Sequence, residues 1–77
     1  MIIEGIREIL GRLGVDRPVD RDTRVDEGLG LDSIRRIELV IEIENRFRVR
    51  LEPEDEEEIE TIGDLVRVIR RRLAADD

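Results

Sequence analysis

The sequence predicts an all-α fold: a small bundle of three main helices and one short helix, with a long loop between the first two. Apolar residues recur at helical spacing in three segments, and no segment of useful length alternates as a strand would. The interruptions carry Gly, Pro and helix-capping residues. We expect one domain over residues 1–77, because the chain is close to the lower size limit for folding around a single core. A chain this short buries only about 60% of the surface that its unfolded form exposes. A large enclosed active site is not expected.

The first helix is expected over residues 2–13, with one face against the core. When successive residues are placed about 100° apart, its apolar residues fall in a single stripe about 120° wide. They are Ile2, Ile3, Ile6, Ile9, Leu10 and Leu13. Gly14 is a favourable residue for ending the helix.

A long loop is expected over residues 14–31, where the helical periodicity fails. It has 18 residues, and loops of this length in small domains are usually either functional or disordered. Apolar residues are scattered through it, namely Val15, Val19, Val25, Leu29 and Leu31. We therefore expect the loop to pack down on the bundle.

The second helix is expected to begin at Asp32, a good N-cap residue, and to run to Phe47. Its apolar residues form two stripes on nearly opposite sides. One stripe contains Leu39, Val40, Ile43 and Phe47, and the other contains Ile34, Ile37 and Ile41. Because a helix in a small bundle cannot bury both sides, we expect the first stripe in the core and the second at a contact surface. Burial of Ile37 and Ile41 under the long loop is the alternative.

A short helix is expected from Pro53, because Pro suits a first helical turn and acidic residues favour that end of the helix dipole. Ile59 is its expected inward residue, and the acidic run 54–58 is expected to be solvated, because it lacks the pattern of a calcium loop. No metal site is expected. Thr61 and Asp64 form a capping-box pattern at the start of the last helix. Its buried stripe should contain Ile62, Leu65, Val66, Ile69 and Leu73.

Composition argues against an autonomous enzyme. The chain has no Cys, His, Lys, Tyr, Trp or Gln, which removes thiol and amine nucleophiles and the usual neutral-pH proton shuttle. A net charge of -7 repels nucleic acid and anionic membranes and suits partners with basic surfaces. The opening residues lack the pattern of a signal peptide or a membrane span. We expect a cytoplasmic monomer that does not bind nucleic acid.

One motif carries chemistry. The stretch Gly30-Leu31-Asp32-Ser33-Ile34 places the only serine of the chain at the start of a helix, where its hydroxyl can be reached by another protein. Downstream, Glu38-Leu39-Val40, Glu44 and Phe47 follow, and Thr61-Ile62-Gly63-Asp64-Leu65 begins the last helix. At these spacings, the chain resembles the acyl carrier proteins over almost its whole length.

This resemblance implies an acyl-carrier-like bundle and a non-catalytic role. It implies that a phosphopantetheinyl transferase attaches a 4'-phosphopantetheine arm from coenzyme A to Ser33. The arm ends in a thiol that holds acyl groups as thioesters and delivers them to enzymes of fatty acid or polyketide biosynthesis. Asp32 is implied to assist binding of the transferase's metal or of coenzyme A, although capping the helix is its first expected role. For Ser33 alone, the alternative is an ordinary helix-start serine.

The resemblance also implies two groups of site residues. Docking to basic patches on partner enzymes would use Leu31, Ile37, Glu38, Ile41 and Glu44. A candidate acyl pocket would be lined by Leu39, Ile43, Ile59, Ile62 and Leu65, which are core residues by default. The alternative for the two glutamates is solvated helix surface.

Four positions depart from the pattern of fatty acid carriers. Arg35 and Arg36 follow Ser33 and Ile34. The resulting Asp-Ser-Ile-Arg-Arg-Ile-Glu is closer to the Asp-Ser-Ile-Lys-Arg-Val-Glu of carrier domains in polyunsaturated fatty acid and polyketide synthases. Gly28 replaces an acid, and Glu56 stands where many fatty acid carriers have a small apolar residue, which argues against a deep pocket. The main rival is a helical interaction module, designed or reconstructed, that is never modified. A carboxylate-based hydrolase and a domain cut from a synthase are further alternatives.

Overall fold

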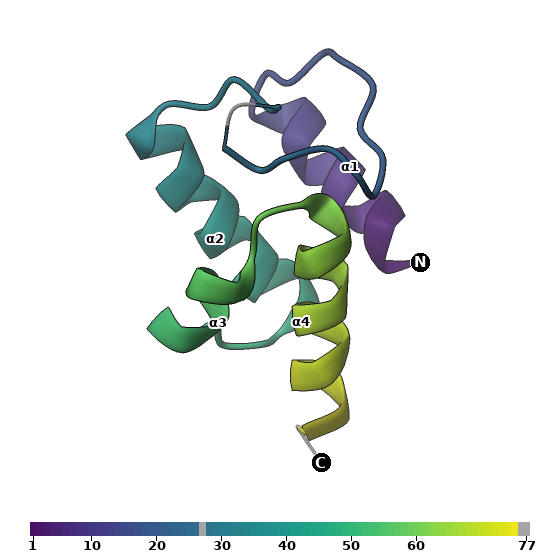
Figure 1. Ribbon diagram of the computed structural model, residues 1–77, viewed down its shortest axis with the longest axis vertical. Coiled ribbons are helices and arrows are strands. Elements are labelled where there is room, and N and C mark those ends of the chain that lie inside the picture. Colours follow the sequence, from purple (N-terminus) through teal and green to yellow (C-terminus); the bar gives the residue numbers. More distant parts are fainter. Residues whose placement is uncertain (27, 76–77) are drawn as a thin grey trace.

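The structure is a computed structural model that describes residues 1–26 and 28–75 (Figure 1). Its helices are α1 (Ile2–Arg12), α2 (Ser33–Phe47), α3 (Pro53–Glu58) and α4 (Ile62–Ala75). Over the described residues, extended pairing is limited to one isolated bridge between Arg24 and Thr61. The predicted all-α class, with three main helices, one short helix and a long loop before α2, is confirmed.

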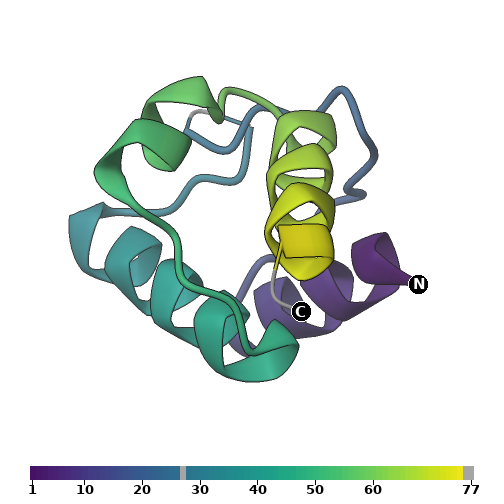
Figure 2. The same cartoon turned by 90° about the horizontal axis from the view of Figure 1, so that it is seen from below.

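The helices surround a single apolar core. Helix α1 packs against both α2 and α4, and α3 lies across the bundle from α1, between α2 and α4 (Figure 2). The core draws on all three main helices, the loop before α2 and the connection after it. Its buried members are Ile6, Ile9, Leu10, Leu13, Leu29, Leu39, Ile43, Leu51, Ile62, Leu65, Val66, Val68 and Ile69.

The contact between α1 and the end of α2 depends on a glycine. Gly5 is buried on α1, and a Cβ atom there would lie 2.8 Å from Cζ of Phe47. Real Cβ atoms do not approach another carbon so closely, so the absence of a side chain allows the Phe47 ring to pack on α1.

Helix α1 ends in a Schellman motif. The backbone N–H of Val15 donates to the carbonyl of Leu10 at 3.0 Å, and that of Gly14 donates to Gly11 at 3.2 Å. Gly14 has a φ of 93°, a left-handed conformation that costs little without a Cβ. The predicted stop at Gly14 is confirmed, and the motif turns the chain into the long loop.

The long loop packs down on the bundle, as predicted, and pairs with the start of α4. The Val25 N–H donates to the carbonyl of Glu60 at 3.0 Å, and the Ile62 N–H donates to that of Thr23 at 2.8 Å. Leu29 is buried, and the other apolar loop residues pack against the core. The loop is therefore fixed to the helix that is farthest from it in the sequence.

Helix α4 begins as predicted. The Asp64 N–H donates to Oγ1 of Thr61 at 3.2 Å, and the Thr61 N–H donates to Oδ2 of Asp64 at 3.1 Å, which completes the capping box. Hydrogen bonds from the backbone N–H groups of Glu60 and Thr61 lower the pKa of Asp64, because they stabilise its charged form.

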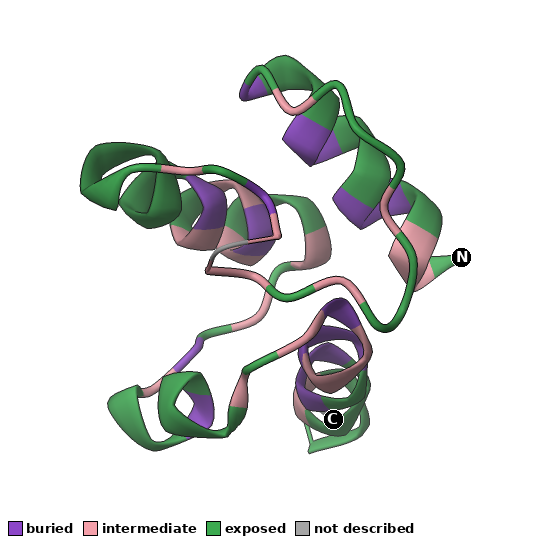
Figure 3. Cartoon of the chain, turned by 45° about the horizontal axis from the view of Figure 1, so that its top comes forward, coloured by how far each residue is buried: buried purple, intermediate pink, exposed green. Residues whose placement is uncertain are grey.

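The predicted buried stripe of α4 is wrong at its end. Leu73 is 41% exposed, because the last turns of α4 extend past the other helices (Figure 1). The end of α4 is accordingly coloured as exposed in Figure 3. Val68, which was not predicted, is completely buried. Periodicity identifies the inward side of a helix, but it does not say where the neighbouring elements end.

The prediction for α3 is also wrong in one respect. Its buried residue is Asp55, which is 2% exposed, whereas Ile59 caps the helix and is half-buried against the core. The Asp55 carboxylate accepts hydrogen bonds from the Glu52 N–H at 2.9 Å, from Arg71 at 2.8 Å and from Nε of Arg72 at 2.9 Å. One residue of the acidic run is thus an internal link between α3 and α4 rather than solvated surface.

Candidate functional site

The segment that leads to Ser33 is held by a tight turn and an arginine. Gly30 has a φ of 66°, in the left-handed region that favours glycine. The Arg17 side chain donates to the carbonyl of Gly28 at 3.0 Å, and its guanidinium lies where a Cβ of Gly30 would approach it to 3.2 Å. Sequence reasoning did not identify Arg17, because its partner is a backbone carbonyl eleven residues away.

Asp32 and Ser33 form the start of α2. Asp32 is the N-cap, and its Oδ1 accepts a hydrogen bond from the Arg35 N–H at 2.8 Å. Ser33 is the first helical residue, and its side chain is exposed. Within the described part of the chain, no residue forms a hydrogen bond with its hydroxyl. The hydroxyl is therefore accessible from solvent at the positive end of a 15-residue helix.

The outer side of α2 carries an exposed apolar stripe. Ile34 is 70% exposed, Ile37 61% and Ile41 50%, at spacings of three and four residues that place them on one side of the helix. The loop does not cover Ile37 and Ile41, which excludes the alternative of burial. Exposed apolar side chains grouped in this way are typical of interaction surfaces.

The two glutamates predicted for docking differ in their surroundings. Glu38 is exposed and lies 3.7 Å from Nε of Arg35, an ion pair that leaves it largely solvated. Glu44 is half-buried, and its Oε2 accepts a hydrogen bond from the Leu51 N–H at 2.9 Å. Glu44 therefore has a structural role in holding the chain after α2, which the sequence did not reveal.

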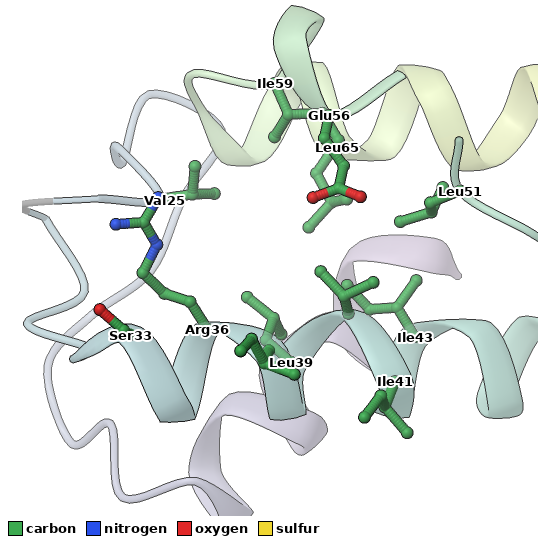
Figure 4. Close-up of a pocket in the computed structure, with 12 residues that line it drawn as sticks. Val25, Ser33, Arg36, Leu39, Ile41, Ile43, Leu51, Glu56, Ile59 and Leu65 are labelled. Atoms are coloured by element: carbon green, nitrogen blue, oxygen red, sulfur yellow. The ribbon is translucent and has the colours of Figure 1, made fainter. Parts of the chain in front are cut away.

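A groove of about 510 Å³ lies between α2, α3 and α4 (Figure 4). Four of the five residues named for the candidate acyl pocket line it, namely Leu39, Ile43, Ile59 and Leu65. Ile62, the fifth predicted residue, does not line the groove, because it is completely buried in the core.

The same groove begins beside the candidate attachment site. Ser33 is among its lining residues, and Figure 4 shows Ser33 at one end, with the Arg36 side chain next to it. Glu56 of α3 points its carboxylate into the space between α2 and α4 (Figure 4). The sequence did not indicate that Arg36 lines the groove.

Comparison with known proteins agrees with this geometry. Residues 2–69 match the family described as the phosphopantetheine attachment site, so the chain belongs to this family. The acyl carrier protein of Thermotoga maritima is 34% identical over 74 residues, covering 94% of this chain and 91% of that protein. The resemblance to acyl carrier proteins is confirmed. The cofactor attached at such sites is 4'-phosphopantetheine, and proteins of this kind are carriers rather than catalysts.

Two further features of the described residues bear on the site. No helix among them is both long enough and apolar enough to cross a membrane. They also contain no group of three or more acidic side chains arranged to hold a metal ion.

Proposed function

We propose that Ser33 carries the 4'-phosphopantetheine arm and that the protein tethers acyl groups for enzymes of fatty acid or polyketide biosynthesis in the cytoplasm. The observation that carries this proposal is the exposed Ser33 hydroxyl at the first position of α2. Membership of the phosphopantetheine attachment family supports it, because Ser33 is the only serine in the chain.

The residues around Ser33 fit such an arm. The first backbone N–H groups of α2 and its dipole favour the negative charge of a phosphodiester at this position. Arg36, one turn further along the helix, adds a positive charge at the mouth of the groove. When bound, the arm supplies a terminal thiol for thioester formation, which the cysteine-free chain lacks.

Attachment requires an external enzyme. The Ser33 oxygen would form a bond to the phosphorus of the pantetheine phosphate, and the bond from that phosphorus to the nucleotide half of coenzyme A would break. The hydroxyl proton must pass to a base, and the chain has neither His nor Lys to accept it. We therefore assign the base to a phosphopantetheinyl transferase.

The transferase and the acyl-transfer enzymes are proposed to dock on the exposed side of α2. Ile37 and Ile41 offer apolar contact, Glu38 offers a solvated carboxylate for a basic patch, and Leu31 extends the surface toward Ser33. Asp32 contributes through the helix start that it caps. The contribution of Glu44 is secondary, because its carboxylate already accepts a hydrogen bond from Leu51.

Intact-mass measurement after incubation with coenzyme A and a transferase of broad specificity tests the proposal. The unaltered chain should gain one arm, and Ser33→Ala should gain none. Thr23→Ala is the matched control, because it removes a hydroxyl from the loop and leaves Ser33 in place; it should gain one arm. An unchanged mass of the unaltered chain would favour the rival, a helical interaction module that is never modified.

A further inference from the structure

The groove beside Ser33 contains a charged group within an apolar lining. Leu39 and Ile43 lie on one side of it and Leu65 on another, while the Glu56 carboxylate points into the space between them (Figure 4). In the described part of the chain, the Glu56 side chain has no hydrogen-bond or ion-pair partner. Glu56 is exposed, so its carboxylate is solvated in the open groove.

The orientation of Glu56 follows from its neighbour in the sequence. Asp55 is buried and bonded to Arg71 and Arg72, which fixes one side of α3 against α4. The next residue of a helix is rotated by about 100°, which turns Glu56 away from the arginines and toward α2. These partly buried ion pairs therefore hold α3 in the orientation in which Glu56 faces the groove.

A saturated acyl chain in this groove would have to remove water from the Glu56 carboxylate. Such a chain has no group that donates a hydrogen bond, so the ionised carboxylate would lose its solvation and gain nothing in return. Apart from Glu56, the lining is apolar except for Ser33 and Arg36 at one end. The volume of about 510 Å³ lies within the usual range of about 300–1,000 Å³ for small-molecule sites.

We infer that Glu56 is a specificity-determining residue: its carboxylate keeps saturated acyl chains out of the groove, so that a saturated cargo on Ser33 stays in solvent. The inference rests on the proposed function, because it concerns a chain tethered at Ser33. It goes beyond that function because it says where the cargo lies and which residue decides this.

The test does not depend on a transferase. Because the chain has no cysteine, Ser33→Cys provides a single thiol, which can be alkylated with a linker of pantetheine length that ends in an octanoyl group. NMR then detects contacts between the terminal methyl group of the octanoyl chain and the methyl groups of Leu39, Ile43 and Leu65. Failure of enzymatic modification at Ser33 would leave this experiment unaffected, so the two proposals fail separately.

In the Ser33→Cys protein, we expect no such contacts and a melting temperature that does not change on attachment. With Glu56→Ala added, the contacts should appear, and attachment should raise the melting temperature by about 4 °C or more. Contacts of equal intensity with and without Glu56 would overturn the inference. Their absence from both proteins would also overturn it, because Glu56 would then not be the determinant.

Two further variants separate charge from size and position. Glu56→Gln keeps the size of the side chain and removes its charge, so we expect this variant to admit the octanoyl chain. If Glu56→Gln excluded the octanoyl chain as completely as the protein with Glu56 does, the charge would have no role. Glu57→Ala is the matched control, because Glu57 is exposed and does not line the groove. It should exclude the chain as the Ser33→Cys protein does.

Discussion

The Asp55 carboxylate accepts a hydrogen bond from Nε of Arg72 at 2.9 Å and so joins the short helix α3 to the third turn of α4. The carboxylate is almost fully buried, and Arg71 and the backbone N–H of Glu52 also donate to it. The bond from Glu52 is the largest cause that lowers the pKa of Asp55 below its ordinary value of 3.8; the two arginines act in the same direction, and burial opposes them.

Asp55→Asn should therefore reduce the free energy of unfolding by about 2 kcal/mol at pH 7, because the amide replaces a charged acceptor of several hydrogen bonds. Urea denaturation measures this loss. Glu54→Gln is the control, because Glu54 is the exposed neighbour, and it should change stability by less than about 0.5 kcal/mol.

The pH dependence of the same variant has a defined sign. Since folding lowers the pKa of Asp55, its charge stabilises the protein fully above the unfolded value of 3.8, and this contribution is lost as the pH falls through the folded value. The stability difference between wild type and Asp55→Asn should be constant from pH 7 to about pH 5 and should shrink below 3.8. An equal difference at pH 3 and pH 7 would contradict this assignment.

Glu38→Arg should slow modification of Ser33 by roughly fivefold at low ionic strength, because it reverses a charge on the proposed docking surface. Added salt should reduce the effect, since exposed charges are screened. Circular dichroism should show unchanged helicity. Glu57→Arg makes the same charge change on α3 and serves as the control; an equal slowing in both variants would point to net charge rather than to docking.

Glu44→Ala should act on stability. It leaves the Leu51 N–H without its acceptor, and we expect a loss of about 1–2 kcal/mol in the free energy of unfolding. Glu42→Ala is the matched control on the same helix. Among the described residues Glu42 pairs only with Arg12, at the surface, where such a pair contributes about 0–1 kcal/mol. Thermal unfolding of the two variants compares them directly, and equal losses would argue against the role of Glu44 in the connection after α2.

Substitution by alanine should have opposite effects on stability at two glycines of α1. Gly5→Ala places a Cβ 2.8 Å from the Phe47 ring and should destabilise the protein by about 1–3 kcal/mol. At Gly11, the new Cβ of Gly11→Ala would have no atom within 4 Å apart from its chain neighbours and the backbone of its own helix. This substitution should stabilise the protein by about 0.5–1 kcal/mol, because alanine favours a helix. An increase of the melting temperature in both variants would show that helix propensity outweighs the contact with Phe47.

The helices could be predicted because each main helix carries a distinct local signal. Asp32 and Thr61 are capping residues, and Gly14 ends α1 as expected. The two opposite stripes of α2 also predicted which isoleucines stay exposed, because a small bundle has room for only one of them in its core. These inferences need only residues that are close together in the sequence.

The errors concern contacts between residues that are distant in the sequence. Asp55 looked like one of several equivalent acids, and only its distance to Arg71 and Arg72, sixteen and seventeen residues away, distinguishes it. In the candidate site, spacing did not show that Ile62 is buried in the core and does not line the groove. Nor did it show that Arg17 donates a hydrogen bond to Gly28, just before Ser33.

Both ends of α3 are attached to rigid parts of the molecule. Its first turn is bonded through Asp55 to α4, and the residues just after it pair with the long loop through Val25 and Glu60. Because α3 is held at both ends, it cannot rotate away from α2 about one end. The width of the space between α3 and α2 is therefore set by contacts within the protein that need no bound ligand.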